Sequence, residues 1–309
     1  MKQRFRGALV GLATGDALGT TLEFRSPGSF TPIFDMVGGG PFSLQPGQWT
    51  DDTSMAMCLA ESLLACQGFD AADQMDRYLR WYLEGYWSST GRCFDIGGTV
   101  HAALRAYQRS GEPFSGSTDP RSAGNGSLMR LAPVVLFYAH DAAQAVKWAG
   151  ESSRTTHGAA AAVDACRYMA ALITAALHGA EKESLLATDF WPIDGTSSEA
   201  ALVSEIAEIA EGSFKRRQPP QIRGTGYVVR SLEAALWAFF HGDDFQAGCL
   251  LAANLGDDAD TTGAIYGQLA GAFYGEEAIP RQWRDRLARY NDIVALADSL
   301  LDLASNGAK

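Results

Sequence analysis

The sequence has little proline, few cysteines and a shortage of positive charge, and each shortage excludes a class of protein. Only 11 of its 309 residues are proline, which excludes a collagen or a proline-rich low-complexity chain. The five cysteines form no C-x-x-C pair, which argues against a disulfide framework or zinc ribbon and favours a reducing compartment. The net charge is −11, whereas a nucleic-acid or anionic-membrane surface needs a basic stripe.

Other absences concern targeting and known motifs. No run approaches the ~18 apolar residues of a membrane span. Asp16 interrupts the apolar start of the chain and no cleavage pattern follows it, so a signal peptide is not expected. We therefore expect a cytoplasmic protein without a membrane partner. Rossmann, P-loop, H-E-x-x-H and G-x-S-x-G motifs are all missing, which argues against the nucleotide sites and hydrolases that use them.

Helical periodicity dominates the remaining pattern. The long stretches without proline are 47–112, 134–192 and 221–279. Within them, apolar residues recur at helical spacing, as in Met55, Leu59 and Leu63, and only short pieces such as 134–137 could be strands. The sequence therefore predicts an all-α fold. We expect loops where proline, glycine, serine or charge is concentrated: 20–49, 110–127, 181–199 and 211–226.

Glycine is abundant, with 33 residues against the ~7% usual in globular proteins. Two sets recur every four residues: Gly7, Gly11, Gly15 and Gly19, and Gly263, Gly267, Gly271 and Gly275. On a helix this spacing puts each set on one face. Glycine weakens a helix by ~1 kcal/mol relative to alanine, so close helix–helix approach is the expected compensation.

Two clusters of acidic residues and threonine begin predicted helices. They are the segments 50–53 and 257–262. Helix N-capping explains either cluster alone. Crowded carboxylates with hydroxyls also suit Mg²⁺, Mn²⁺ or Ca²⁺. If the two helix starts converge, the spacing permits two metals that share Asp260, and the two glycine-striped helices should touch near these aspartates.

Other glycines lie in polar loops at 38–40, 124–127 and 224–226. Such loops can turn backbone N–H groups toward an anion such as a phosphate, although turn formation alone also explains each of them. His157 precedes a long alanine-rich helical pattern and could be a cap or a pocket residue.

Taken together, seven motifs resemble those of the ADP-ribosylglycohydrolases, within them the bacterial dinitrogenase-reductase-activating type. In chain order they are 11–19 with Glu23, 47–53, 95–99, 124–130, Thr156-His157, 226–228 and 256–264. The resemblance implies one compact, orthogonal multi-helix domain over residues 1–309, with a central dinuclear metal site. It also implies hydrolysis of the bond between ADP-ribose and a protein side chain, arginine in this type and serine in another branch.

The same resemblance implies roles for individual residues. The metal ligands would be Thr50, Asp51, Asp52, Asp258, Asp260 and Thr261, holding two Mg²⁺ or Mn²⁺ ions. Glu23, Asp95 and Asp260 would be the catalytic carboxylates. The ADP-ribose site would comprise Gly124, Asn125, Gly126, Ser127, His157 and Tyr227. The expected partners are an ADP-ribosylated protein as substrate and ADP-ribose as product, and we expect a monomer.

The motifs do not determine which side chain carries the ADP-ribose. Gly98 and Leu128 depart from what similar proteins often carry, namely Asn and a small residue. Hydrolysis of another linkage (serine, a nucleic-acid base or an acyl ester of ADP-ribose) is therefore an alternative to arginine. A third alternative is a non-catalytic protein, since the family resembles some lens crystallins. A complete set of six oxygen ligands counts against it, because a purely structural protein has no need of them.

Overall fold

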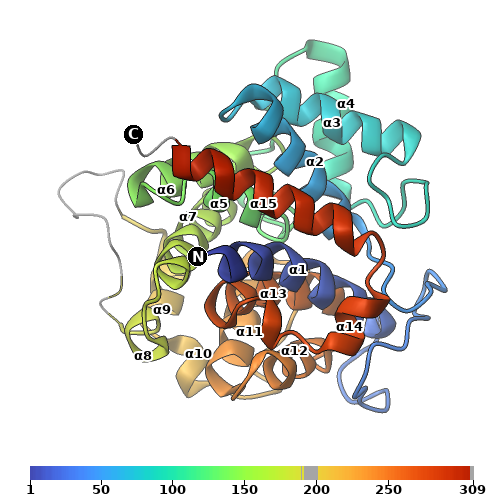
Figure 1. Cartoon of the computed structure of the whole chain (residues 1–309), viewed down its shortest axis with the longest axis vertical. Coiled ribbons are helices and arrows are strands. Elements are labelled where there is room, and N and C mark those ends of the chain that lie inside the picture. The colour runs from blue at the N-terminus through green and yellow to red at the C-terminus, as the bar shows by residue number, and fades with distance from the viewer. Residues whose placement is uncertain (189, 191–200, 307–309) are drawn as a thin grey trace.

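The computed structural model describes residues 1–188, 190 and 201–306, and regular structure in this part of the chain is helical (Figure 1). The extended pairing found among these residues consists of isolated bridges, Gly39 with Leu44, Ser117 with His157 and Gly124 with Tyr227. The predicted all-α fold is confirmed.

The helices vary widely in length. In chain order, the described α-helices are α1 (Lys2–Gly19), α2 (Asp51–Cys66), α3 (Ala71–Glu84), α4 (Gly98–Ser110), α5 (Ala132–Phe137), α6 (Ala142–Arg154), α7 (Ala160–Leu177), α8 (Lys182–Leu185), α9 (Ser204–Ala210), α10 (Ser213–Arg216), α11 (Val228–His241), α12 (Phe245–Ala253), α13 (Ala259–Tyr274), α14 (Arg281–Arg286) and α15 (Tyr290–Asn306). Short 3₁₀ turns are η1 (Thr20–Leu22), η2 (Pro120–Ser122) and η3 (Glu276–Ala278).

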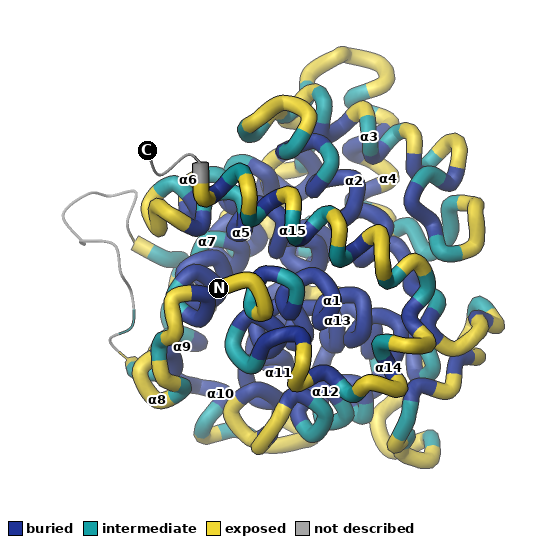
Figure 2. Tube along the Cα trace, viewed as in Figure 1, coloured by how far each residue is buried: buried dark blue, intermediate teal, exposed yellow. Residues whose placement is uncertain are grey.

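The first and the thirteenth helices form the centre of the molecule. Among the described elements, α1 and α13 make the most extensive contact, and α12, α11, α7, α2 and α15 pack around them. Figure 2 shows both central helices as buried over most of their length, with exposed segments at the periphery. Because α1 comes from the N-terminal part of the chain and α13 from the C-terminal part, their contact places the motifs of both parts side by side.

Close backbone contact between α1 and α13 explains the glycine stripes. A Cβ atom built on Gly11 would lie 2.3 Å from the carbonyl oxygen of Gly267, and one on Gly15 would lie 2.0 Å from that of Gly263. No side chain fits at these distances, so glycine is required at both positions. The prediction that the striped helices touch is confirmed, although Gly275 is not part of the helical stripe. That residue follows the end of α13 with φ +86° and belongs to the turn rather than the stripe.

Three local predictions need correction. The piece 134–137 is not a strand, since it lies in α5, where Pro133 in the first turn supplies a φ already suited to a helix. The predicted loop 211–226 contains α10. The predicted loop 181–199 contains α8, and its residues 189 and 191–199 lie outside the described part of the chain.

The helix α7 is long and largely apolar. By length and composition it is apolar enough to cross a membrane, with a mean hydropathy of 1.4, and 78% of it is buried inside the protein. A buried core helix passes the same test, and α7 packs against α6, α11 and α13. The sequence predicts no run of about 18 apolar residues. Asp164 and Arg167 do interrupt α7, which reaches the length and mean hydropathy of a span without being an unbroken apolar run.

Candidate metal and active site

An aspartate of α1 fixes the start of α2. Asp16 lies one residue beyond Gly15, where the two central backbones meet, and it is buried. Its carboxylate accepts hydrogen bonds from the backbone N–H groups of Thr50 and Thr53, at 2.9 and 3.0 Å, and from the Thr53 hydroxyl at 2.6 Å. Asp16 thereby caps α2 from another helix and satisfies N–H groups that a helix start leaves without partners.

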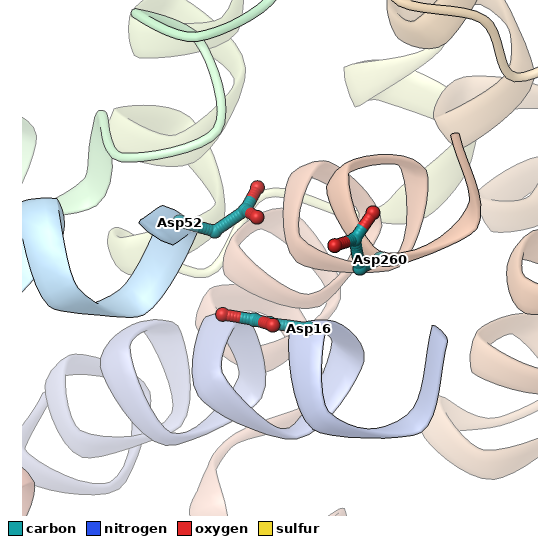
Figure 3. A group of neighbouring side chains, drawn as sticks. All are labelled: Asp16, Asp52 and Asp260. Carbon is teal, nitrogen blue, oxygen red and sulfur yellow. The ribbon is translucent and has the colours of Figure 1, made fainter. Parts of the chain in front are cut away.

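This capping brings together carboxylates from three helices. Figure 3 shows the side chains of Asp16 from α1, Asp52 from α2 and Asp260 from α13 converging on one space. Oxygen atoms of these three carboxylates lie within 4.8 Å of one another. Glu23, Asp258 and Asp260 form a second such group. Asp260 belongs to both, as expected for a residue shared between two cation positions.

The electrostatics of this cluster are unfavourable without a cation. Burial raises the pKa of Asp16 to about 6. Burial, reinforced by the neighbouring carboxylates, raises the pKa values of Asp51, Asp52 and Asp260 well above the usual range. Asp52 Oδ1 is also buried without a hydrogen-bond partner among the described residues. An unpaired, buried carboxylate oxygen is the kind of ligand that a hard cation such as Mg²⁺ prefers.

Glu23, a member of the second group, and Asp95 are the remaining predicted carboxylates of the site. Glu23 Oε2 accepts a hydrogen bond of 3.0 Å from the Ala259 N–H at the start of α13, and burial raises the pKa of Glu23 to about 7. Asp95 has a left-handed backbone, with φ 62°. Its pKa is raised to about 8, first by burial and then by the negative charge of Glu23. Carboxyl groups with pKa values near neutrality are suited to proton transfer.

A cavity of about 330 Å³ opens onto these groups. The predicted site residues that line it are Glu23, Asp51, Asp95, Gly124, Asn125, Gly126, His157, Asp258, Asp260 and Thr261. A larger cavity of about 830 Å³ lies elsewhere and is lined mainly by apolar and proline residues. It contains none of the predicted site residues, so the smaller cavity is the candidate active site.

Four predicted residues lie outside the cavity lining. Thr50 and Asp52 sit behind it, with 2.8 Å between the threonine hydroxyl and Asp52 Oδ2. Ser127 points away, its Oγ lying 2.8 Å from Ser153 Oγ in the interior. Tyr227 is partly exposed, and its backbone pairs with Gly124 at the rim.

Comparison with known proteins identifies the family. The model of the family described as ADP-ribosylglycohydrolase matches residues 1–309. The chain belongs to the ADP-ribosylglycohydrolase family. This confirms the resemblance inferred from the motifs.

Several relatives resemble this glycohydrolase over nearly its whole length. It is 45% identical to "ADP-ribosylarginine hydrolase Tri1" of Pseudomonas putida (strain GB-1), over 97% of this chain and 78% of the relative. It is 42% identical to the protein of the same name from Serratia proteamaculans (strain 568), over 97% and 79%. The "ADP-ribosyl-[dinitrogen reductase] glycohydrolase" of Rhodospirillum rubrum is 32% identical, over 97% and 96%. A solved structure, "ADP-ribosylglycohydrolase-related protein complex", has a TM-score of 0.86 and 46% identity, covering 98% of each chain.

The sequence pattern did not identify Asp16 and Phe24 as site residues of this glycohydrolase. Asp16 is a single acidic residue in an apolar stretch. The only feature of the sequence that could have pointed to it as a site residue is its position next to Gly15 of the stripe. Phe24 lines the cavity with 67% of its surface exposed and a left-handed φ of 59°. Its N–H donates to the carbonyl of Asp257, which also has a positive φ of 56°. Backbone strain at such positions is common at functional sites, but no sequence pattern announces it.

Proposed function

We propose that this glycohydrolase hydrolyses the N-glycosidic bond between ADP-ribose and an arginine side chain of a modified protein. The observation that carries the proposal is 45% and 42% identity, over 97% of the chain, to two proteins named ADP-ribosylarginine hydrolase. The gathering of the predicted carboxylates around one cavity supports it. Reversal of mono-ADP-ribosylation, with free ADP-ribose as product, follows from this chemistry.

We also propose that the site takes two Mg²⁺ or Mn²⁺ ions. Their ligands would come from the starts of α2 and α13, namely Thr50, Asp51, Asp52, Asp258, Asp260 and Thr261. The sharing of Asp260 between two carboxylate groups and the unpaired Asp52 Oδ1 support this assignment. When bound, such ions supply Lewis-acid polarisation of water and sugar oxygens.

The protein's own carboxyl groups would handle the protons. Glu23 and Asp95 both line the cavity. A carboxylate there can accept a proton from the attacking water and return it to the leaving guanidine, provided that its pKa lies near the working pH. The positions of these two residues on the cavity wall, beside Asp51, Asp258 and Asp260, fit that role.

The loop 124–126 and His157 would hold ADP-ribose. Gly124 and Gly126 line the cavity, and a side chain at either position would meet the ring of His157. Asn125 is anchored by its side-chain N–H₂, which donates to Asp258 Oδ2 at 2.9 Å. The loop is therefore tied to the start of α13, and ADP-ribose bound against it would lie next to the metal ligands. We propose that Tyr227 covers the rim of the same site.

The setting of the reaction is part of the proposal. All five cysteines are free, which agrees with a reducing compartment, and we propose that the protein acts in the cytoplasm as a monomer on an ADP-ribosylated protein.

The acceptor is tested by offering proteins that carry ADP-ribose on arginine or on serine, with Mg²⁺ or Mn²⁺, and identifying the released product by mass spectrometry. We expect release from arginine, and we expect both a chelator and Asp260→Ala to abolish it. Asp285→Ala is the matched control, since this aspartate is largely exposed, and it should retain full activity. Release from serine alone would replace arginine by serine as the acceptor, and undiminished release by Asp260→Ala would refute the metal assignment.

A further inference from the structure

His157 lies directly beneath the loop that borders the cavity. It is buried, yet it contributes to the cavity lining. A Cβ atom built on Gly124 would lie 3.3 Å from His157 Nε2, and one on Gly126 would lie 2.9 Å from Cε1. The two glycines therefore put no side chain of their own against the Nε2 edge of the ring, and Nε2 has no hydrogen-bond partner among the described residues.

The opposite edge of the ring is held by a chain of hydrogen bonds. Arg130 Nη2 donates to Thr156 Oγ1 at 2.7 Å, and Thr156 Oγ1 lies 2.9 Å from His157 Nδ1. A guanidinium has no acceptor atom, so the direction of the first bond is fixed. The threonine hydroxyl is then free to donate its own proton to Nδ1.

The reverse arrangement is unfavourable. If Nδ1 carried the proton, Thr156 Oγ1 would receive two donors. Its own O–H would then point into the buried surroundings with no acceptor among the described residues. Leaving a buried donor unsatisfied is costly. The imidazole is also held neutral, because burial and then the charge of Arg130 lower the pKa of His157 to about 3.

Arg130 connects this chain of bonds to the cavity loop. Its Nη1 donates to the carbonyl oxygen of Gly126 at 2.9 Å, while Nη2 holds Thr156. The guanidinium is buried over the ring of Tyr78, at 4.5 Å from its centroid, and no carboxylate pairs with it in the described part of the chain. A buried cation without an acidic partner is unfavourable. This cost indicates that the role of Arg130 lies in its hydrogen bonds to Gly126 and Thr156.

We propose that Arg130 and Thr156 are positioning residues that fix His157 as the Nε2–H tautomer, so that its ring presents a hydrogen-bond donor to an oxygen of bound ADP-ribose. The choice of ligand rests on the proposed function, whereas the tautomer does not. ADP-ribose offers diphosphate and ribose oxygens as acceptors. A neutral donor fixed in orientation beside a group of carboxylates can hold one of them without adding a group that titrates near neutrality.

The tautomer is measured directly by long-range ¹H–¹⁵N NMR on the full-length, ¹⁵N-labelled protein with Mg²⁺. The spectrum of His157→Gln identifies which signals belong to His157. We expect a protonated Nε2 and an unprotonated Nδ1 in the wild type. A proton on Nδ1, or protons on both ring nitrogens, would overturn the proposal. The wild-type spectrum alone decides this, without variants of Arg130 or Thr156.

Variants then test how the tautomer is held. In Thr156→Val the hydroxyl donor is lost, and we expect a shift of the proton toward Nδ1 and a loss of about tenfold in ADP-ribose affinity by calorimetry. Thr156→Ser keeps the hydroxyl and should restore both. Thr174→Val is the matched control, because Thr174 is also buried but its hydroxyl has no partner among the described residues, and it should change neither.

An unchanged tautomer and affinity in Thr156→Val would contradict the proposal. A folded Thr156→Ser variant that lacks the wild-type tautomer and affinity would contradict it as well. If the wild type shows the expected tautomer but does not bind ADP-ribose, the proposed function and the ligand assignment fail. The tautomer shift in Thr156→Val and its reversal in Thr156→Ser then still decide whether this chain of bonds fixes the ring.

Discussion

Asp16 and Asp52 are neighbouring buried carboxylates with opposite structural roles. Asp16 accepts hydrogen bonds with both oxygens from the start of α2. Asp52 accepts one from the hydroxyl of Thr50, and its other oxygen has no partner among the described residues. The first carboxylate therefore has hydrogen-bond donors for both oxygens within the chain, whereas the second keeps one oxygen that a cation could bind.

Asp16→Asn should destabilise the protein. The amide nitrogen that replaces one oxygen cannot accept a hydrogen bond and would face N–H and O–H donors. We expect a loss of about 2–4 kcal/mol in the free energy of unfolding, measured by denaturant unfolding of the metal-free protein. A variant as stable as the wild type would show that the cap on α2 contributes nothing.

Asp52→Asn should have the opposite effect in the absence of metal. Removing one of several crowded negative charges relieves repulsion, so we expect the metal-free variant to gain about 1 kcal/mol or more. The rise in melting temperature that Mg²⁺ gives the wild type should be absent. Calorimetric melting with chelator and with Mg²⁺ measures both, and an equal Mg²⁺ response in the two proteins would refute the assignment of Asp52 as a ligand.

The stability of the metal-free protein should fall as pH rises. The folded-state pKa values of Asp16, Glu23 and Asp95 are raised to about 6, 7 and 8, above the unfolded values of roughly 4. The folded protein therefore binds more protons than the unfolded chain between about pH 4 and 8, and it loses stability across that range. We expect a chelator-treated sample to melt higher at pH 5.5 than at pH 8, and Mg²⁺ to weaken this dependence. A melting temperature that rises over the same range would contradict the expectation.

At the scale of the helix, the contact between α1 and α13 sets the geometry of the site. Gly15 contacts Gly263 across the two helices. Gly15 is next to Asp16 in the chain, and Gly263 follows Asp260 by three residues. Any separation of the two backbones would therefore move the carboxylates apart. The contact between the glycine stripes therefore belongs both to the core of the fold and to the group of carboxylates beside it.

Gly11→Ala should accordingly be severe. Its Cβ would meet the carbonyl oxygen of Gly267 at 2.3 Å, and backbone cannot move aside as a flexible side chain can. We expect a loss of about 3 kcal/mol or more in the free energy of unfolding. Gly98→Ala is the matched control, because an added Cβ meets nothing within 4 Å at the start of α4. It should be neutral or slightly stabilising, and equal losses in the two variants would contradict the account.

The sequence predicted those features that repeat or cluster along the chain. Stripes at four-residue spacing predicted the contact of α1 with α13. The acidic groups at 50–53 and 257–262 predicted two helix starts, and a shared site only on the condition that these starts converge. It could not predict that Gly275 leaves the stripe, because the end of α13 depends on a positive φ. The role of Asp16 depends on a helix 34 residues away in the chain, at Thr50, and leaves no local pattern.

Side-chain direction was the other feature that the sequence left undetermined. Ser127 and Asn125 stand two residues apart in one glycine-rich loop, but Asn125 lines the cavity while Ser127 points to Ser153. Loop residues have no fixed periodicity, so only the folded contacts decide which of them reach the cavity. The same holds for Phe24, whose exposure follows from its left-handed backbone.

At the scale of the whole molecule, the fold brings together carboxylates that are far apart in the chain. Glu23, Asp52, Asp95 and Asp260 come from four separate segments. The helices between them form a core in which α1, near the N-terminus, packs against α13 and α15 (Figure 1). A protein with a net charge of −11 thus concentrates acidic groups in its interior, where only cations or protons can neutralise them.

The central claim is that the starts of α2 and α13 form one site for two divalent cations. Anomalous diffraction from crystals grown with Mn²⁺ tests it most directly. We predict two peaks among Asp51, Asp52, Asp258, Asp260 and Thr261, with Asp260 contacting both, and no such peaks in Asp260→Ala. The absence of any peak there in the wild type, or binding of Mn²⁺ only on the surface, would contradict the claim.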